Sequence, residues 1–196
     1  MGLSLRVKML TERFSQALYL ALQAHTNQKR KGTNIPYISH PLGVASIALE
    51  YGADEDQAMA ALLHDAIEDG GNEYAQEIRK QFGNRVADIV EGCTDGIPDA
   101  TGEKEAWKPR KDRYLAHLKN APEDVLLVSG ADKLHNARAI VDDLVRIGPA
   151  VFERFTASQE QTLWYYDTLA SIFTERKTPI AEVLTETVSR MKILAT

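Results

Sequence analysis

The chain has 196 residues, of which 44% are hydrophobic and 26% charged, and its formal net charge at pH 7 is −5. This length suits one domain with a sizeable core. The negative charge argues against a general nucleic-acid-binding surface, so any anionic ligand must be met by a local basic cluster. Cys93 is the single cysteine, which excludes an intrachain disulfide and fits a reducing compartment. Apolar runs are too short for a bilayer and the first ten residues lack a signal-peptide core, so we expect a cytoplasmic protein without a membrane partner.

The first half of the chain shows helical patterns and no convincing strand. Segment 11–25 has apolar residues at the spacing of one helical face. Segment 40–52 opens with Pro41 in its first turn and ends at Gly52. Segment 54–70 begins at Asp54, with Gln57 three residues later as a variant of the capping box, and ends at Gly70.

The second half continues the helical pattern after one interruption. Residues 95–108 predict a loop that is long for a compact helical domain, and such loops are often functional. Further helices are predicted over 72–83, 84–96, 109–121, 122–148, 156–177 and 178–194. We therefore expect an all-α fold, a single domain over residues 1–196 with about eight to ten helices.

The segment LLHDAIEDG, residues 62–70, concentrates charge between apolar residues. It contains His64, Asp65, Glu68 and Asp69 within two predicted helical turns. A buried charge is costly unless it is paired or bound to a metal. On a continuous helix, residues four apart share a face, which would stack His64 on Glu68 and Asp65 on Asp69.

Two further motifs carry side chains of the same kind. His40 stands at a predicted helix start, and ADKLHNAR, residues 131–138, places Asp132 and Asn136 on one helical face with His135 beside them. A mixed set of imidazoles and carboxylates suits Mn²⁺, Fe²⁺, Co²⁺ or Zn²⁺. The candidate metal ligands are His40, His64, Asp65 and Asp132.

A metal in this set would leave coordination positions for water and substrate, lower the pKa of that water and polarise a phosphoryl oxygen. Glu68 and Asp69, one turn away, are candidates to orient the water or move its proton. A His–Asp dipeptide alone is weak evidence, since it also occurs by chance. The interpretation of this dipeptide as part of a metal site depends on the upstream histidine, the Glu–Asp pair that follows, and the distant helical aspartate.

Basic residues precede His40 in the segment NQKRKGTNIPYISHP. Lys29, Arg30 and Lys31 would be a solvated charge run in the simplest interpretation. A phosphate-rich ligand needs such a cluster, however, and arginine offers bidentate contacts to its oxygens. Lys133 and Arg138 would complete a basic rim near the last aspartate, which favours a small phosphorylated nucleotide over a polymer.

Other polar and aromatic residues have simpler interpretations. His25 is expected to be packed or hydrogen-bonded, and His117 to lie on the surface. The aromatic cluster 164–166 is expected mainly in the core. The stretch EKEAWKPRKDR, residues 103–113, is interpreted as a solvated charged segment.

Together, AHTNQKRKGTNIPYISHP, ALLHDAIED and ADKLHNAR resemble the hydrolase domain of RelA/SpoT-type alarmone enzymes, in particular the free-standing small alarmone hydrolases. The likeness runs from about residue 12 to residue 175. It implies an all-helical HD fold and hydrolysis of the 3′-pyrophosphate of (p)ppGpp to GDP or GTP and pyrophosphate. The residue roles that it implies are Mn²⁺ binding by His40, His64, Asp65 and Asp132, water activation by Glu68 and Asp69, and substrate contacts by Arg30, Lys31 and Asn136.

The sequence departs from this family at several points. Ser129 stands where the family often has lysine, Asn27 replaces a usual glycine, and one residue is added between Lys31 and Pro36. These changes leave the ligand set intact but leave open the base specificity and the phosphate contacts. The alternatives are adenine alarmones, (p)ppApp; a broader HD nucleotide phosphatase, for example of the NADPH 2′-phosphate; and a non-catalytic nucleotide-sensing module. The oligomeric state, including a homo-oligomer, also stays open.

Overall fold

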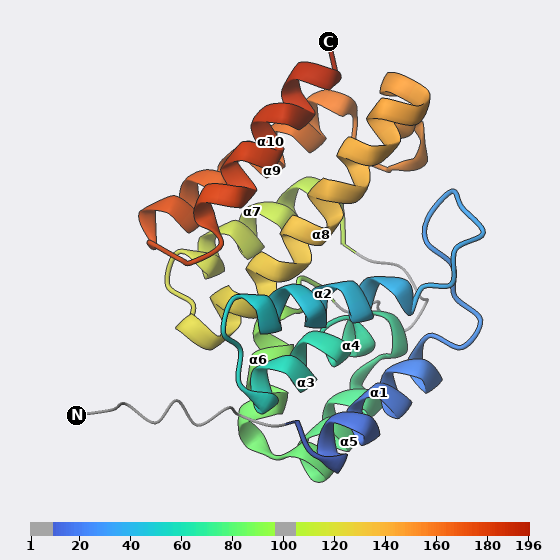
Figure 1. Cartoon of the computed structure of the whole chain (residues 1–196), viewed down its shortest axis with the longest axis vertical. Helices are drawn as coiled ribbons and strands as arrows, with labels where there is room; N and C mark the ends of the chain where they lie inside the picture. Colours follow the sequence, from blue (N-terminus) through green and yellow to red (C-terminus); the bar gives the residue numbers. More distant parts are fainter. Residues whose placement is uncertain (1–9, 97–104) are drawn as a thin grey trace.

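The computed structural model describes residues 10–96 and 105–196, and its regular structure is helical (Figure 1). Within these ranges the β-structure is an isolated bridge between Lys29 and Pro36. The helices are α1 (Glu12–Ala24), α2 (Ser39–Glu50), α3 (Glu55–Leu63), α4 (Ala66–Gly70), α5 (Asn72–Phe82), α6 (Asn84–Cys93), α7 (Trp107–Leu118), α8 (Glu123–Ile147), the 3-10 helix η1 (Gly148–Arg154), α9 (Gln159–Glu175) and α10 (Ala181–Leu194). The expected all-α fold is confirmed. Among the described helices, none combines the length and apolar character needed to cross a membrane.

The long helix α8 is the centre of the molecule. It packs against α2, α3 and α6 on one side and against α9 and α10 on the other, so it separates the two groups of helices in Figure 1. At Gly130 a side chain would collide, because a Cβ atom there would lie 2.6 Å from Ile180 and 3.1 Å from Phe173. The absence of a side chain thus lets the last two helices approach the α8 segment that carries Asp132.

The prediction of one helix over 54–70 is wrong at its centre. Its start is as expected, because the side chain of Asp54 and that of Gln57 form both bonds of the capping box. The helix α3 ends at Leu63, however, and α4 begins only at Ala66. His64 Nδ1 lies 2.8 Å from the carbonyl oxygen of Ala61, so this ring bonds a main-chain oxygen of the last turn of α3.

This break places the two adjacent ligand candidates in a turn. His64 and Asp65 therefore lie between two helices and not within one continuous helix. Asp65 is the N-cap of α4, and its carbonyl still accepts a hydrogen bond of 3.0 Å from Asp69 N. The separate short helix α4 carries Glu68 and Asp69 beyond the turn.

The start of α7 also differs from expectation. The loop predicted over 95–108 extends too far, because α7 already begins at Trp107. Residues 97–104 of that loop lie outside the described residues. The described part of α7 packs against α9, which turns one face of this charged helix inward.

Candidate functional site

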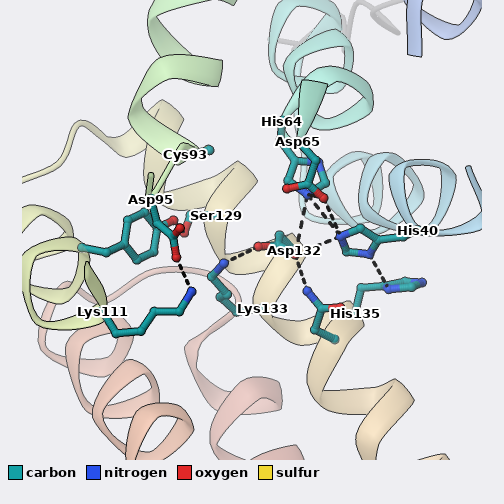
Figure 2. Close-up of polar contacts among 12 residues, drawn as sticks. His40, His64, Asp65, Cys93, Asp95, Lys111, Ser129, Asp132, Lys133 and His135 are labelled. Atoms are coloured by element: carbon teal, nitrogen blue, oxygen red, sulfur yellow. Dashed lines mark hydrogen bonds and ion pairs between the residues drawn. The ribbon is translucent and has the colours of Figure 1, made fainter. Parts of the chain in front are cut away.

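His40 and His64 form the core of the candidate metal centre. Both side chains are buried, and their Nε2 atoms lie 3.2 Å apart. The opposite ring nitrogens are occupied, since His64 Nδ1 bonds the Ala61 carbonyl and His40 Nδ1 lies 2.9 Å from Nδ1 of His135. This arrangement is typical of metal-binding histidines, whose second nitrogen is held by a neighbouring group. Figure 2 shows the rings facing the same point.

Two carboxylates approach that point from different elements. Asp65 Oδ2 lies 3.3 Å from His40 Nε2 and 3.1 Å from His64 Nε2. Asp132 Oδ1, on α8, lies 3.1 Å and 3.6 Å from the same two atoms. The group of His40, His64 and Asp65 has the spacing of a metal site by itself, and Asp132 faces it. The structure thus brings the four predicted ligands together, and their nitrogen and oxygen donors fit a divalent transition metal.

The electrostatics of the centre also favour a cation. Burial opposes the ionised form of Asp65, but the nearby imidazoles of His64 and His40 hold its pKa well below the usual range. Burial likewise opposes ionised Asp132, yet Lys133 and the two imidazoles lower its pKa. Because both carboxylates stay ionised in a buried place, they are suited to a positively charged partner.

Tyr37 and Gln28 hold the carboxylates around the centre. The Tyr37 hydroxyl donates a hydrogen bond of 2.6 Å to Asp65 Oδ2, and burial together with Asp65 raises the pKa of this phenol. Gln28 Nε2 donates to Asp69 Oδ2 over 2.8 Å. Neither supporting residue is predictable from the sequence, because single residues in a loop carry no periodic signal that marks them.

The centre opens into a cavity of about 610 Å³. Both proposed water-activating residues, Glu68 and Asp69, line it. Four of the five predicted substrate residues also line it: Arg30, Lys31, Lys133 and Asn136. Arg30 donates to Asn136 Oδ1 over 2.7 Å, and Asn136 Nδ2 donates to Asp132 Oδ1 over 2.6 Å.

The placement of Arg138 at this site is wrong. Its side chain lines a separate hollow between α8 and α10, together with Asp142, Glu186 and Arg190. On an ideal helix, Arg138 follows Asp132 by six residues and points about 120° away from it. Asn136 follows Asp132 by four residues and points within about 40° of it. Nearness in sequence was therefore a poor guide to the basic rim.

The structure places two unexpected cations in the interior. The interpretation of residues 103–113 as solvated is wrong for Arg110 and Lys111, whose side chains are 11% and 14% exposed. Both bond to the carboxylate of Asp95, and Lys111 lines the cavity. A signal existed in the sequence, because Lys111 shares a helical face with Trp107 and Tyr114.

Comparison with known proteins agrees with this geometry. The family model described as HD domain matches residues 17–163. This chain belongs to the HD domain family. The resemblance to alarmone hydrolases inferred from the motifs is confirmed by its relatives.

One relative of this HD domain is the guanosine-3′,5′-bis(diphosphate) 3′-pyrophosphohydrolase MESH1 of Xenopus tropicalis. It is 40% identical over 137 residues, which are 68% of this chain and 70% of the relative. The guanosine-3′,5′-bis(diphosphate) 3′-pyrophosphohydrolase of Aquifex aeolicus is 37% identical over 131 residues, or 66% of this chain. The chain spans only 18% of that longer relative.

Solved structures show the same architecture. A metazoan ortholog of SpoT, described as hydrolysing ppGpp and acting in starvation responses, superposes with a TM-score of 0.73 at 25% identity, covering 95% of this chain and 98% of that one. The protein lmo0812 of Listeria monocytogenes gives a TM-score of 0.67 at 26% identity, covering 80% and 99%.

The remaining polar and aromatic residues of the HD domain lie where the sequence placed them. His25 is buried, with Nδ1 2.7 Å from Gln28 Oε1, and His117 is exposed. Tyr165 and Tyr166 are buried in the core, and Tyr166 also lines the cavity. These expectations are confirmed.

Proposed function

We propose that this HD domain hydrolyses the 3′-pyrophosphate of guanosine alarmones, (p)ppGpp, to GDP or GTP and pyrophosphate, with Mn²⁺ as its metal. The observation that carries the proposal is the meeting of two imidazoles and two carboxylates beside a cavity lined by lysines and arginines. The activity for which the Xenopus relative is named supports it. The proposal takes residues 1–196 as a single phosphohydrolase domain in the cytoplasm, with a small nucleotide as its ligand.

The metal would be held by His40, His64, Asp65 and Asp132. The chemistry that it would supply there is a water of lowered pKa and a polarised phosphoryl oxygen. The surrounding protein keeps the carboxylate ligands ionised and the imidazole ligands correctly oriented. Tyr37 does so for Asp65 through its hydroxyl, and Ala61 does so for His64 through its carbonyl.

The proton transfers fall to the carboxylates of α4. Water adds to the phosphorus attached to O3′, the bond from that phosphorus to O3′ breaks, and pyrophosphate leaves with the oxygen of the water. Glu68 or Asp69 accepts the proton of the attacking water, and a proton returns to O3′ of the departing nucleotide. Both residues line the cavity that the metal ligands also line, and carboxylates commonly act as general acids and bases.

The nucleoside part of the substrate would lie towards Arg30 and Asn136. These side chains bond to each other, and Asn136 bonds to Asp132, so a nucleotide that contacts Arg30 is coupled to the ligand set. Lys31 lines the same wall. Arginine binds phosphate in a bidentate manner and also stacks on bases.

The test is a panel of three substrates offered to metal-loaded protein: ppGpp, ppApp and NADPH. Pyrophosphate release from ppGpp supports the proposal. Faster release from ppApp would replace guanine by adenine as the preferred base. Phosphate release from NADPH alone would establish the broader phosphatase, and nucleotide binding without any turnover would establish the sensing module.

A further inference from the structure

A second cluster of charge lies beside the candidate metal centre. Asp95, Lys111 and Lys133 gather on the side of Asp132 that faces away from His40 and His135 (Figure 2). All three line the same cavity as the metal ligands. Lys111 comes from α7 and Lys133 from α8, and their side chains are only 14% and 12% exposed.

The contacts of this cluster leave it rich in cations. The single carboxylate of Asp95 accepts hydrogen bonds from both Arg110 and Lys111. Lys133 pairs with Asp132 Oδ2, while Oδ1 of the same carboxylate faces the imidazoles. Arg110 Nε is buried and has no hydrogen-bond partner among the described residues. Buried cations in excess of their carboxylates are costly, so the cluster is suited to an incoming anion.

The charge of the whole cavity leads to the same conclusion. Six lysine or arginine side chains and six aspartate or glutamate side chains line it. These charges balance, so a divalent cation at the histidines would make the loaded cavity positive by two charges. An anionic ligand would restore the balance. Lys133 is one of the cations beside the metal centre, because it is bonded to the predicted metal ligand Asp132.

Aromatic rings hold the two lysines against the cavity wall. Lys111 Nζ lies 5.0 Å from the centre of the Tyr165 ring, and Lys133 Nζ lies 5.1 Å from that of Tyr114. The Tyr114 hydroxyl in turn lies 2.7 Å from Ser129 Oγ. Each ammonium group has three donors, and each uses one of them on an aspartate, so further donors stay available to a ligand.

We propose that Lys111 and Lys133 form the subsite for the distal phosphate of the substrate's 3′-pyrophosphate, with Asp95 as the residue that positions Lys111. This inference rests on the proposed function. The phosphorus attached to O3′ would lie at the metal centre, the distal phosphate at these two lysines, and the nucleoside at Arg30. The cavity would then orient the substrate by charge at one end and by base and ribose contacts at the other.

The test measures binding of inorganic pyrophosphate, which needs no turnover. The manganese-loaded full chain is titrated calorimetrically with pyrophosphate at a fixed excess of Mn²⁺. Lys111→Met is expected to weaken the Kd by about tenfold or more, because it removes a hydrogen bond between charged groups. Its effect on ppGpp hydrolysis should appear mainly in KM.

Lys108→Met is the matched control, because it makes the same substitution on the same helix. The Lys108 side chain is 48% exposed and pairs with Asp112, so its removal should leave the Kd unchanged. Equal binding by Lys111→Met and wild type would overturn the subsite, whether or not the protein hydrolyses ppGpp. Conversely, binding that depends on Lys111 without hydrolysis of ppGpp would retain the subsite and reject the proposed function.

A second measurement covers the case in which Lys111→Met does not fold. A crystal structure of the wild-type, metal-loaded protein with pyrophosphate is expected to place a phosphate oxygen within hydrogen-bonding distance of Lys111 Nζ and Lys133 Nζ. Pyrophosphate found only at the Arg30 end would overturn the proposal.

Discussion

The two sides of Asp132 are held by different forces. On the metal side, a ring nitrogen of His135 holds the imidazole of His40 and a main-chain carbonyl oxygen holds that of His64. These two imidazoles are carried by α2 and by the turn after α3. On the other side, ion pairs across 15 and 16 residues tie Arg110 and Lys111 to Asp95. The first side is therefore ordered mainly by hydrogen bonds of imidazole rings and the second by ion pairs, so different substitutions should disrupt each side.

The largest expected effect comes from breaking the metal side. Asp132→Ala removes a predicted ligand and the partner of both Lys133 and Asn136. We expect the loss of most bound metal and of turnover, because the bound metal would supply both the activated water and the polarised phosphoryl oxygen. Metal analysis of purified protein together with pyrophosphate release measures this. An unchanged metal content in the variant would contradict the ligand assignment.

A proton-transfer variant should separate chemistry from metal binding. Glu68→Gln keeps the size of the side chain but removes its basicity, so we expect kcat to fall by roughly 10²–10⁴-fold. The metal content should stay at the wild-type level, since Glu68 is not among the four predicted ligands. Full activity would transfer the role to Asp69, which the corresponding Asp69→Asn variant would then show.

Removal of a supporting contact should have a smaller effect. Tyr37→Phe deletes the hydroxyl that donates to Asp65 Oδ2, and partners of metal ligands typically contribute about 10–100-fold in metal affinity or activity. Titration of metal-depleted protein with Mn²⁺ measures the change. Tyr19→Phe is the control, because Tyr19 is 64% exposed. Equal metal affinity in both variants would show that this hydrogen bond is dispensable.

The nucleoside end can be tested with a variant that leaves all four predicted metal ligands in place. Arg30→Lys keeps the charge but loses the planar fork that bonds Asn136. We expect kcat/KM for ppGpp to fall by about tenfold while the metal content stays constant. An unchanged kcat/KM would indicate that Arg30 contributes only its positive charge, which is also what the exposed Lys29 could contribute.

The smallest expected effect concerns stability and pH on the α7 side. Burial opposes ionised Asp95, but Lys111, Lys133 and Arg110 hold its pKa below the ordinary value of 3.8. A carboxyl group with a lowered folded-state pKa stabilises the fold above its unfolded pKa, and this contribution is lost as the pH falls through the folded value. Asp95→Asn should therefore cost about 1–3 kcal/mol at pH 7, and the difference should shrink below about pH 3.8. Urea unfolding at several pH values measures it, and a difference independent of pH would contradict the ion pairing.

The sequence by itself determined the helical fold, the family and most of the metal side. Helical spacing and a capping box marked the helices. The His–Asp and Asp–x–x–x–Asn patterns, together with the histidine at a predicted helix start, indicated all four predicted ligands. These signals are readable because each depends on residues within one or two helical turns. The break between α3 and α4 was not predicted. It is accompanied by a bond from the His64 ring to a main-chain oxygen, and residue spacing does not indicate such a bond.

Only the tertiary structure decided which cations face the cavity. Arg138 turns to another hollow, whereas Lys111 joins Lys133 because α7 packs on α9 and Asp95 draws the charged face inward. Ser129, the departure from the family pattern, is wholly buried against Tyr114 and contributes no charge. The direction of a long charged side chain follows from the helices that pack around it and from its ion-pair partner. Both lie far away in the sequence, so composition and periodicity leave that direction undetermined.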